Sequence, residues 1–231
     1  METQVDYGKK TRAGNYDCCI LYECGNRGPE PVIPAPETTV GLKYPVPHFY
    51  VTDSGDMADP PHWLKASQEK LGKLQRQLGR MRPGSRNYRK AVQKFRILHE
   101  HIANQRWDFI HKESRRIANG WDAVCIKSDD LAEMDRELSR STPAGFGMFR
   151  EYLRYKLERQ GKTLLTVDRY IPTTRTCSAC GAVRDAVHYK ENTWRCPKCG
   201  AVHRREANAA KNIKAQGLAR YFSLHEQCES A

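Results

Sequence analysis

Residues 176–213 read TCSACGAVRDAVHYKENTWRCPKCGAVHRREANAAKNI, and they constrain the fold more than any other part of the chain. Two CxxC pairs, separated by 15 residues, supply four cysteines: Cys177, Cys180, Cys196 and Cys199. Four thiolates at this spacing are typical ligands of a tetrahedral Zn²⁺ ion that has no open coordination position. The sequence therefore predicts a zinc ribbon whose ion is structural and performs no chemistry.

The loop between the two pairs combines basic and aromatic side chains. Arg184, Lys190 and Arg195 are suited to phosphate contacts, and aromatic neighbours such as Trp194 to stacking on bases. The alternative is that the aromatic residues only pack inside the ribbon. Because a closed four-cysteine site leaves no vacancy for a further ligand, we expect His203 to be a surface or phosphate-facing residue.

The net charge of the chain is +12, and it is unevenly distributed. Residues 64–118 contain 15 Lys and Arg against 4 Asp and Glu, and residues 172–214 contain 9 against 3. The positive charge is therefore concentrated in two segments, which indicates binding to a polyanion such as nucleic acid. The alternative is a basic surface that serves only solubility.

The sequence also indicates where the protein works. No uninterrupted apolar run approaches the roughly 18 residues that cross a bilayer, and the opening METQVDYGKK lacks the apolar core of a secretory signal. We therefore expect a cytoplasmic protein, associated with the nucleoid. Thiols stay reduced in that compartment, which favours zinc over disulfides for the paired cysteines.

Apolar runs predict β-strands at residues 38–42, 48–52, 123–127 and 163–167. Helical periodicity predicts a helix over residues 64–81, a second from Tyr88 through Phe109, and a third over residues 141–160. The breaker RPGS separates the first two, which should form an antiparallel hairpin. Strands that alternate with helices indicate an α/β sheet. The first 37 residues are polar, apart from an apolar run at residues 18–22 that fits a strand.

The polar faces of the predicted hairpin are rich in Lys and Arg. Seven of these residues are candidates for phosphate contacts: Lys73, Arg76, Arg80, Arg82, Arg86, Arg89 and Lys90. The alternative is a solvated helix face.

Several strings together resemble a known family. TCSACG, RCPKCG and EANAAKNI are preceded by YKLERQGKTLLTVDRYIPTTRT, and further upstream stand VGLKY, KLGKLQRQLGRMRPGSRNYRK and the DDL of residues 129–131. In order and spacing, over about residues 38–214, they resemble the carboxy-terminal half of TnpB proteins. These are transposon-encoded RNA-guided nucleases related to type V CRISPR effectors.

The resemblance implies a RuvC-like (RNase H-type) mixed sheet with an inserted antiparallel helical hairpin and a zinc ribbon. It divides the chain into a remnant of the family's amino-terminal region with a linker (1–37), a RuvC-like core (38–171) with the hairpin at about 64–118, the ribbon (172–205), and a final helix and tail (206–231). Only about 40 residues precede the first core strand here. We therefore expect one of three cases: this chain has lost most of the amino-terminal region, a homodimer or partner subunit supplies it, or the sequence begins at an internal start.

The family cuts DNA with two divalent ions held by three carboxylates. The matching positions in this sequence are Lys43, Asp129 and Glu206. All three depart from the family's pattern, and the first has its charge reversed. Asp53, Asp56 and Asp130 are the nearest substitutes in sequence, although turn chemistry accounts for Asp53 and Asp56. The resemblance with these departures predicts no catalytic residues, no magnesium and a nuclease-dead protein.

The most concrete expectation is a TnpB-like repressor that uses a guide RNA to occupy a double-stranded DNA target and block transcription. One alternative is an active, metal-dependent RNA-guided DNA endonuclease of a transposon. The other is a non-catalytic transposon remnant or accessory subunit that binds RNA.

Overall fold

The computed structural model describes residues 3–22, 28–45, 48–59, 61–128, 145–185 and 191–229. The chain divides into two compact units. The first comprises residues 1–28 and 61–109, and the second comprises residues 29–60 and 110–231. Within the described residues, no helix has both the length and the apolar character that crossing a membrane requires.

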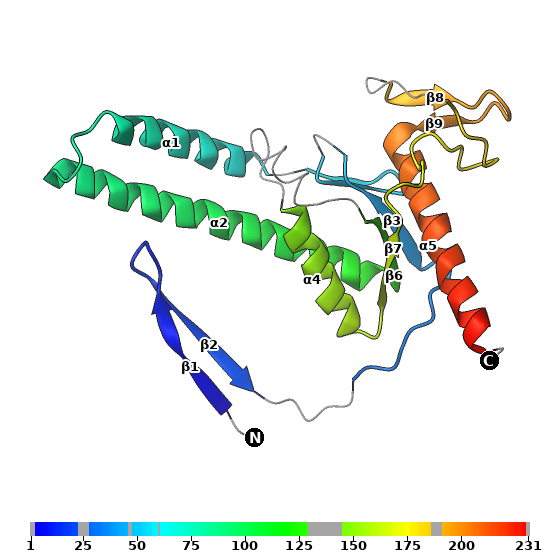
Figure 1. Ribbon diagram of the computed structural model, residues 1–231, viewed down its shortest axis with the longest axis horizontal. Coiled ribbons are helices and arrows are strands. Elements are labelled where there is room, and N and C mark those ends of the chain that lie inside the picture. Colours follow the sequence, from blue (N-terminus) through cyan, green and yellow to red (C-terminus); the bar gives the residue numbers. More distant parts are fainter. Residues whose placement is uncertain are drawn as a thin grey trace. The chain divides into compact units, whose positions relative to one another are not determined.

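Two long helices form the predicted antiparallel hairpin, α1 (His62–Gly79) and α2 (Arg86–Gly120) (Figure 1). The turn between them contains Gly84 at a φ of +81°, a conformation that favours glycine. The hydroxyl of Ser85 accepts a hydrogen bond of 3.1 Å from the backbone N–H of Tyr88, and so caps the start of α2. The residues RPGS thus end one helix and begin the next, as the sequence predicts.

A β-hairpin of β1 (Thr3–Lys10) and β2 (Tyr16–Tyr22) also belongs to the first unit. Its turn is joined to α2 by Thr11, whose hydroxyl donates a hydrogen bond of 3.0 Å to Glu100. The sequence predicted the second strand only. The first has a polar composition, TQVDYGKK, and therefore lacks the apolar run on which strand prediction depends.

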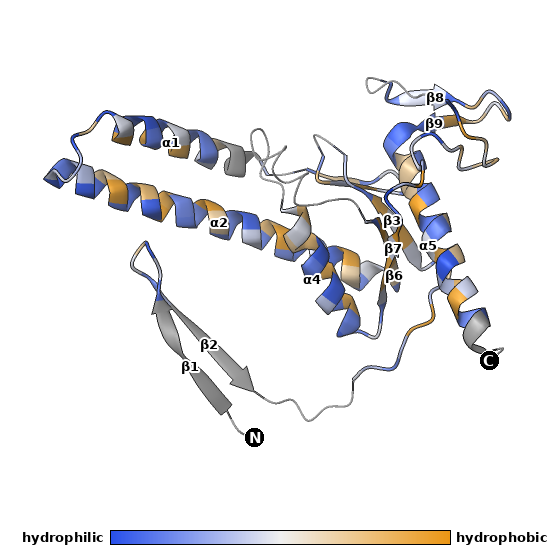
Figure 2. Ribbon diagram, viewed as in Figure 1, coloured by the Kyte–Doolittle hydropathy of each residue, from blue (hydrophilic) through white to orange (hydrophobic). Residues whose placement is uncertain are grey.

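The second unit is built on a five-stranded mixed sheet in the order β5-β4-β3-β6-β7. Its strands are β3 (Thr39–Lys43), β4 (Tyr50–Thr52), β5 (Met57–Ala58), β6 (Ala123–Lys127) and β7 (Thr163–Val167). β3, β6 and β7 are parallel, whereas β4 and β5 continue the sheet antiparallel. Figure 2 shows hydrophobic residues along these central strands. The mixed α/β fold expected from the sequence is confirmed, and the predicted bounds of β6 and β7 match the structure.

Helix α5 (Arg205–Glu229) covers one face of this sheet. Two glycines on the strands and the helix permit the close approach. A Cβ on Gly41 would lie 2.0 Å from the carbonyl oxygen of Ala210, and one on Gly217 would lie 2.5 Å from the sulfur of Cys125. The backbones of α5 and β3 therefore touch where a larger side chain would force them apart.

Helix α4 (Phe146–Glu158) and the end of α2 pack on residues of the opposite face. Tyr50 stacks on Phe149 of α4 at a centroid distance of 5.5 Å, and Phe49 stacks on Phe146 at 5.2 Å. These four rings are nearly or fully buried and form an aromatic core.

Lys156 of α4 is a charged side chain inside this packing, only 3% exposed. Its ammonium donates hydrogen bonds to the hydroxyl of Ser114 (2.6 Å) and the carbonyl of His111 (2.9 Å), both on α2. Among the described residues no carboxylate lies within ion-pair distance of it. Burial, together with the nearby charge of Arg115, lowers the pKa of Lys156 from its ordinary value of 10.5 to about 8.

This buried amine predicts that the protein gains stability in alkaline solution. Between pH 8 and pH 10.5 the unfolded chain keeps a proton on Lys156 that the folded chain has released. The free energy of unfolding should therefore rise across that interval, by up to about 2 kcal/mol after allowance for solvent screening. Denaturant unfolding at both pH values should show this rise in the wild type and its loss in Lys156→Met. Parallel pH profiles for the two proteins would contradict it.

Candidate functional site

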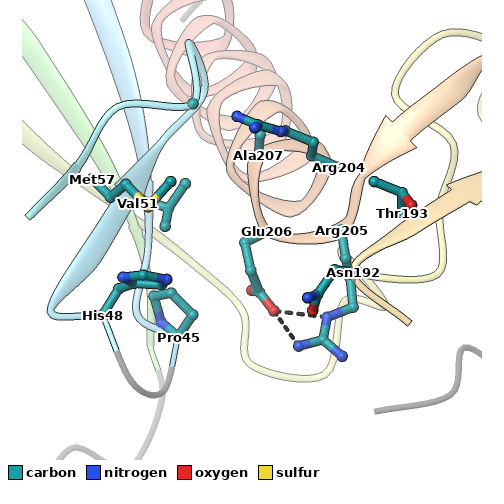
Figure 3. Close-up of a pocket in the computed structure, with 11 residues that line it drawn as sticks. Pro45, His48, Val51, Met57, Asn192, Thr193, Arg204, Arg205, Glu206 and Ala207 are labelled. Atoms are coloured by element: carbon teal, nitrogen blue, oxygen red, sulfur yellow. Dashed lines mark hydrogen bonds and ion pairs between the residues drawn. The ribbon is translucent and has the colours of Figure 1, made fainter. Parts of the chain in front are cut away.

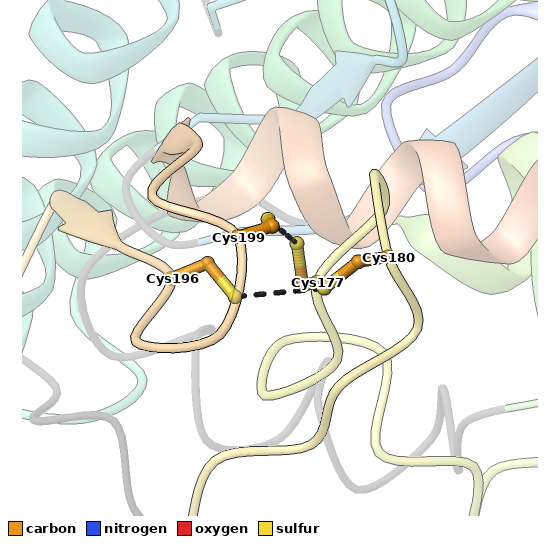
Figure 4. A group of neighbouring side chains, drawn as sticks. All are labelled: Cys177, Cys180, Cys196 and Cys199. Carbon is orange, nitrogen blue, oxygen red and sulfur yellow. Dashed lines mark hydrogen bonds between the residues drawn. The ribbon is translucent and has the colours of Figure 1, made fainter.

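The two CxxC knuckles face each other beside the hairpin of β8 (Thr193–Arg195) and β9 (Val202–Arg204). All four sulfurs lie within 4.8 Å of one another (Figure 4). The Cys177 and Cys199 sulfurs are 3.6 Å apart, and those of Cys180 and Cys196 are 3.7 Å apart. A tetrahedral zinc site with Zn–S bonds of about 2.3 Å needs sulfurs about 3.8 Å apart. The four cysteines therefore have the geometry to hold a metal ion such as zinc.

The knuckles repeat one backbone pattern. In the first, the N–H of Gly181 donates to the carbonyl of Cys177 at 2.9 Å, and in the second Gly200 donates to Cys196 at 2.9 Å. Both glycines have positive φ, +73° and +74°. The backbone N–H of Cys199, with that of Lys198, lowers the pKa of the Cys196 thiol to about 6. The backbone thus favours a thiolate, which is the form that binds a metal.

His203 was expected at the surface, and that expectation is wrong. It is 9% exposed, its ring lies 4.8 Å from that of Trp194, and its Nε2 is 3.0 Å from the sulfur of Cys177. Burial lowers the pKa of His203, with Lys211 adding to the effect. A neutral imidazole that carries its proton on Nε2 would donate to the Cys177 thiolate. The aromatic residue at position 194 packs inside the ribbon, which was the alternative interpretation.

Two asparagines of the EANAAKNI string attach the ribbon to α5. The amide of Asn208 accepts the N–H of Ser178 at 2.9 Å and donates to the carbonyl of Thr176 at 2.7 Å. Asn212, one turn later, donates to the carbonyls of Thr173 at 2.8 Å and Thr176 at 2.7 Å. This role was not predicted from the sequence, although the i, i+4 spacing of the asparagines indicates one helix face.

Lys43 occupies the first position at which the resemblance implies a carboxylate. It ends β3, two residues beyond Gly41, whose side faces Ala210 of α5. Because alternate residues of a strand point to the same side, Lys43 also lies on the α5 face. Its cross-strand partner Val51 lines the same pocket as Glu206.

Glu206 occupies the third position, in the first turn of α5 and four residues before Ala210. Its Oε1 accepts two bonds from the guanidinium of Arg205, each 2.7 Å long. Its Oε2 is buried and has no hydrogen-bond partner among the described residues. The structure therefore brings positions 43 and 206 to the same end of β3, with a lysine at one and an arginine-paired glutamate at the other.

A pocket of about 350 Å³ lies between these elements (Figure 3). Figure 3 shows His48, Val51 and Met57 on one side and Arg205 and Glu206 on the other. The cations that line the pocket outnumber its carboxylates, since Arg204 contributes a second guanidinium. This surplus favours an anion over a cluster of divalent metal ions.

The second position, Asp129, lies outside the described residues, as does Asp130. The neighbouring strand β6 is paired with β3 through Cys125 and Gly41, so its last residue, Lys127, ends at the same sheet edge as Lys43. Two adjacent parallel strands therefore end in lysine at this edge of the sheet, and the resemblance implies a metal ligand at one of the two positions, Lys43.

Asp53 and Asp56, the other two acids that could replace a missing metal ligand, already have partners in the structure. Asp53 accepts the N–H of Gly41 at 3.2 Å and pairs with Lys214 of α5 at 3.1 Å. Asp56 accepts a hydrogen bond of 2.8 Å from the hydroxyl of Ser54. Turn chemistry accounts for Asp56, whereas Asp53 also tethers α5 to the sheet.

The basic candidates fall on two surfaces. Those of the first unit lie on α1, the following turn and the start of α2: Lys73, Arg76, Arg80, Arg82, Arg86, Arg89 and Lys90. In the ribbon, Arg184 pairs with Glu191 at 3.5 Å and covers the Trp194 ring at 5.1 Å. Arg195 donates to the carbonyl of Gly200 at 3.3 Å, and Lys190 lies outside the described residues.

Comparison with known proteins places this fold and site in a family. Residues 20–136, just over half of the chain, match a family model named OrfB_IS605 and described as a probable transposase. Residues 146–213 match the TNB domain described as Cas12f1-like. The chain belongs to the TnpB-like family.

Individual relatives agree with this family. The TnpB-like chain is 33% identical over 215 residues to a Streptomyces pristinaespiralis protein provisionally named RNA-guided DNA endonuclease, covering 91% of this chain and 52% of that protein. It is 29% identical over 208 residues to InsQ of Escherichia coli K12, which has the same provisional name, covering 82% and 51%. The chain thus spans about half the length of these curated relatives.

A solved structure shares the fold. The Cas12f1 protein in a complex with sgRNA and target DNA matches with a TM-score of 0.60 and 20% identity, covering 92% of this chain and 44% of that one. A likeness at this level of identity shows the fold alone.

Proposed function

We propose that this TnpB-like protein binds DNA under the direction of a guide RNA and represses transcription without cutting the DNA. The proposal depends mainly on Lys43, which ends β3 on the face covered by α5. The proposal includes the division predicted from the sequence into core, hairpin, ribbon and final helix, and a zinc ion with a structural role only.

A lysine at this position opposes the two-metal chemistry by which nucleases of this family cut DNA. Mg²⁺ requires oxygen ligands, and two such ions held close together require several carboxylates. An ammonium at position 43 repels them, and Arg205 already offsets the charge of Glu206. Among the described residues at the pocket, one carboxylate faces two guanidinium groups. These residues do not fit a magnesium pair.

Nucleic-acid binding follows from the family and from the two basic segments. The relatives are named for RNA-guided action on DNA, and the fold is that of a protein solved with sgRNA and target DNA. In this mode base pairing selects the sequence, while Lys and Arg hold the phosphate backbone. We assign the backbone role to the basic candidates of α1, α2 and the ribbon.

One observation favours the alternative of a metal-dependent endonuclease. The Oε2 atom of Glu206 is buried at the pocket without a hydrogen-bond partner in the described residues. A buried carboxylate oxygen without a hydrogen-bond partner can bind a divalent cation, which would take the place of the missing partner.

The RNA that accompanies the purified protein tests the guided function. We expect one discrete species with a constant scaffold, and a complex that binds duplex matching the RNA far more tightly than mismatched duplex. Nuclease treatment that strips the RNA should remove this selectivity. A random mixture of RNA, with salt-sensitive binding and no sequence preference, would instead identify an RNA-binding remnant.

A further inference from the structure

A second pocket, of about 430 Å³, lies between the end of α2 and α4 in the second unit. Five residues line it, and all have basic side chains: His111, Lys112, Arg115, Arg116 and Lys156. No acidic residue lines it in the described part of the chain. It is separate from the pocket that contains Glu206, with which it shares no residue.

The cations of this pocket are unequally neutralised. The guanidinium of Arg116 is 2.9 Å from Glu113, which offsets its charge. Lys156 has neutral hydrogen-bond partners only, and Arg115 has no ion pair within the described residues. The pocket therefore retains a positive charge of about two from these residues, and of the two charges only that of Lys156 is buried, where Coulomb attraction to an anion is stronger than at the surface.

Lys156 is also held in place. The hydroxyl of Ser114 and the carbonyl of His111 accept its hydrogen bonds, and His111 itself stacks on Tyr152 with ring centroids 4.2 Å apart. With the Nδ1 of His111, 3.2 Å away, these acceptors take all three N–H donors of the ammonium, so Lys156 attracts an anion through its fixed charge and not through a hydrogen bond. Burying this cation without a counter-ion costs folding free energy, and an anion in the pocket reduces that cost.

A nucleophilic role for Ser114 is excluded by its position. The hydroxyl next to Lys156 resembles a serine activated by a lysine, but Ser114 is 0% exposed. Its proton is directed to the carbonyl of Ile110, 2.7 Å away within the helix. No substrate can reach this oxygen, so the cluster serves binding.

We propose that this pocket binds one backbone phosphate of the nucleic acid that the protein carries. A phosphodiester is a compact anion with several acceptor oxygens, which suits the exposed guanidinium of Arg115 on α2 as its hydrogen-bond donor, with the buried charge of Lys156 on α4 adding to the attraction. The choice of nucleic acid as the source of the phosphate rests on the proposed function. The site itself rests only on the geometry of α2 and α4.

Salt-dependent binding of a labelled, mixed-sequence single-stranded RNA tests this site without any guide. The variants are Lys156→Met, Arg115→Gln and the double variant. The control is Arg154→Gln, which removes the same charge from α4 at an exposed residue paired with Glu151 and Glu158. We expect the double variant to lower the slope of log affinity against log salt by about 0.7, the contribution of one phosphate contact to a single strand. Because both cations attract the same phosphate, the decrease in slope in the double variant should be smaller than the sum of the decreases in the two single variants.

An unchanged slope in the double variant, or an equal change in Arg154→Gln, would overturn the proposal. Lys156→Met should melt no lower than wild type, since a well-packed apolar side chain replaces a buried charge, and the exposed Arg115→Gln should not affect folding. Displacement of the RNA by inorganic phosphate at matched ionic strength would instead assign the pocket to a free anion and reject the backbone phosphate. If the wild type shows no preference for duplex that matches its RNA, but the double variant still lowers the salt slope, the proposed function is rejected and the phosphate site stands.

Discussion

Replacing Cys196 with serine is expected to abolish zinc binding and unfold the ribbon. Among the described residues of the ribbon, the hydrophobic core is small: Cys177, Trp194 and Cys196 are buried, with Cys180 and Ala182 packed against them. Zinc therefore supplies most of its stability, and structural zinc contributes about 10 kcal/mol or more of apparent folding free energy in small zinc domains. The loss should also loosen the start of α5, which the ribbon holds through Asn208 and Asn212.

Metal analysis and limited proteolysis measure this effect. The wild type should contain one zinc per chain and resist cleavage within residues 177–185 and 191–204, whereas Cys196→Ser and chelator-treated wild type should be cut there. Lys198→Ser is the matched control, because it changes an exposed side chain of the same knuckle and keeps the backbone N–H. Full zinc content and wild-type resistance in Cys196→Ser would refute the role of the metal.

A single methyl group on Gly41 is expected to destabilise the second unit severely. The added Cβ would lie 2.0 Å from the carbonyl oxygen of Ala210 and 3.0 Å from the Cβ of Lys214. The contact is with helix backbone, which cannot rotate away, and Asp53 together with Lys214 fixes the helix at this point. We expect Gly41→Ala to cost about 3 kcal/mol or more of unfolding free energy.

Denaturant unfolding of Gly41→Ala beside Gly79→Ala measures this cost. Gly79 lies in the last turn of α1, and a Cβ there would meet no atom within 4 Å. Alanine at that position should be neutral or stabilise the helix by about 0.5–1 kcal/mol. Equal stability of the two variants would show that α5 does not pack on β3 as the structure describes.

The sequence predicted those elements that have strong local signals. The apolar run of β6 and the RPGS break between α1 and α2 fix structure within a few residues, and both predictions are confirmed. β1 gave no such signal, because a polar strand is stabilised by pairing with β2 rather than by its own pattern.

The candidate site was only partly predictable for a similar reason. The spacing of the cysteines in the sequence identifies the four candidate zinc ligands. The family resemblance identifies positions 43 and 206 as places where relatives carry metal-binding carboxylates. The burial of His203 against Cys177 and of Lys156 against Ser114 depends on contacts between residues distant along the chain. Composition and periodicity carry no information about such contacts.

A duplex that matches the bound RNA, end-labelled on each strand in turn, tests the central claim most directly. It is incubated with the RNA-loaded protein in Mg²⁺ or Mn²⁺, probed by footprinting and then run on a denaturing gel. We expect a protected region that requires the matching sequence, with both strands intact and no change in Glu206→Ala. Strand cleavage by the wild type that disappears in Glu206→Ala would show that the site at Lys43 still holds catalytic metal, and would contradict the proposal.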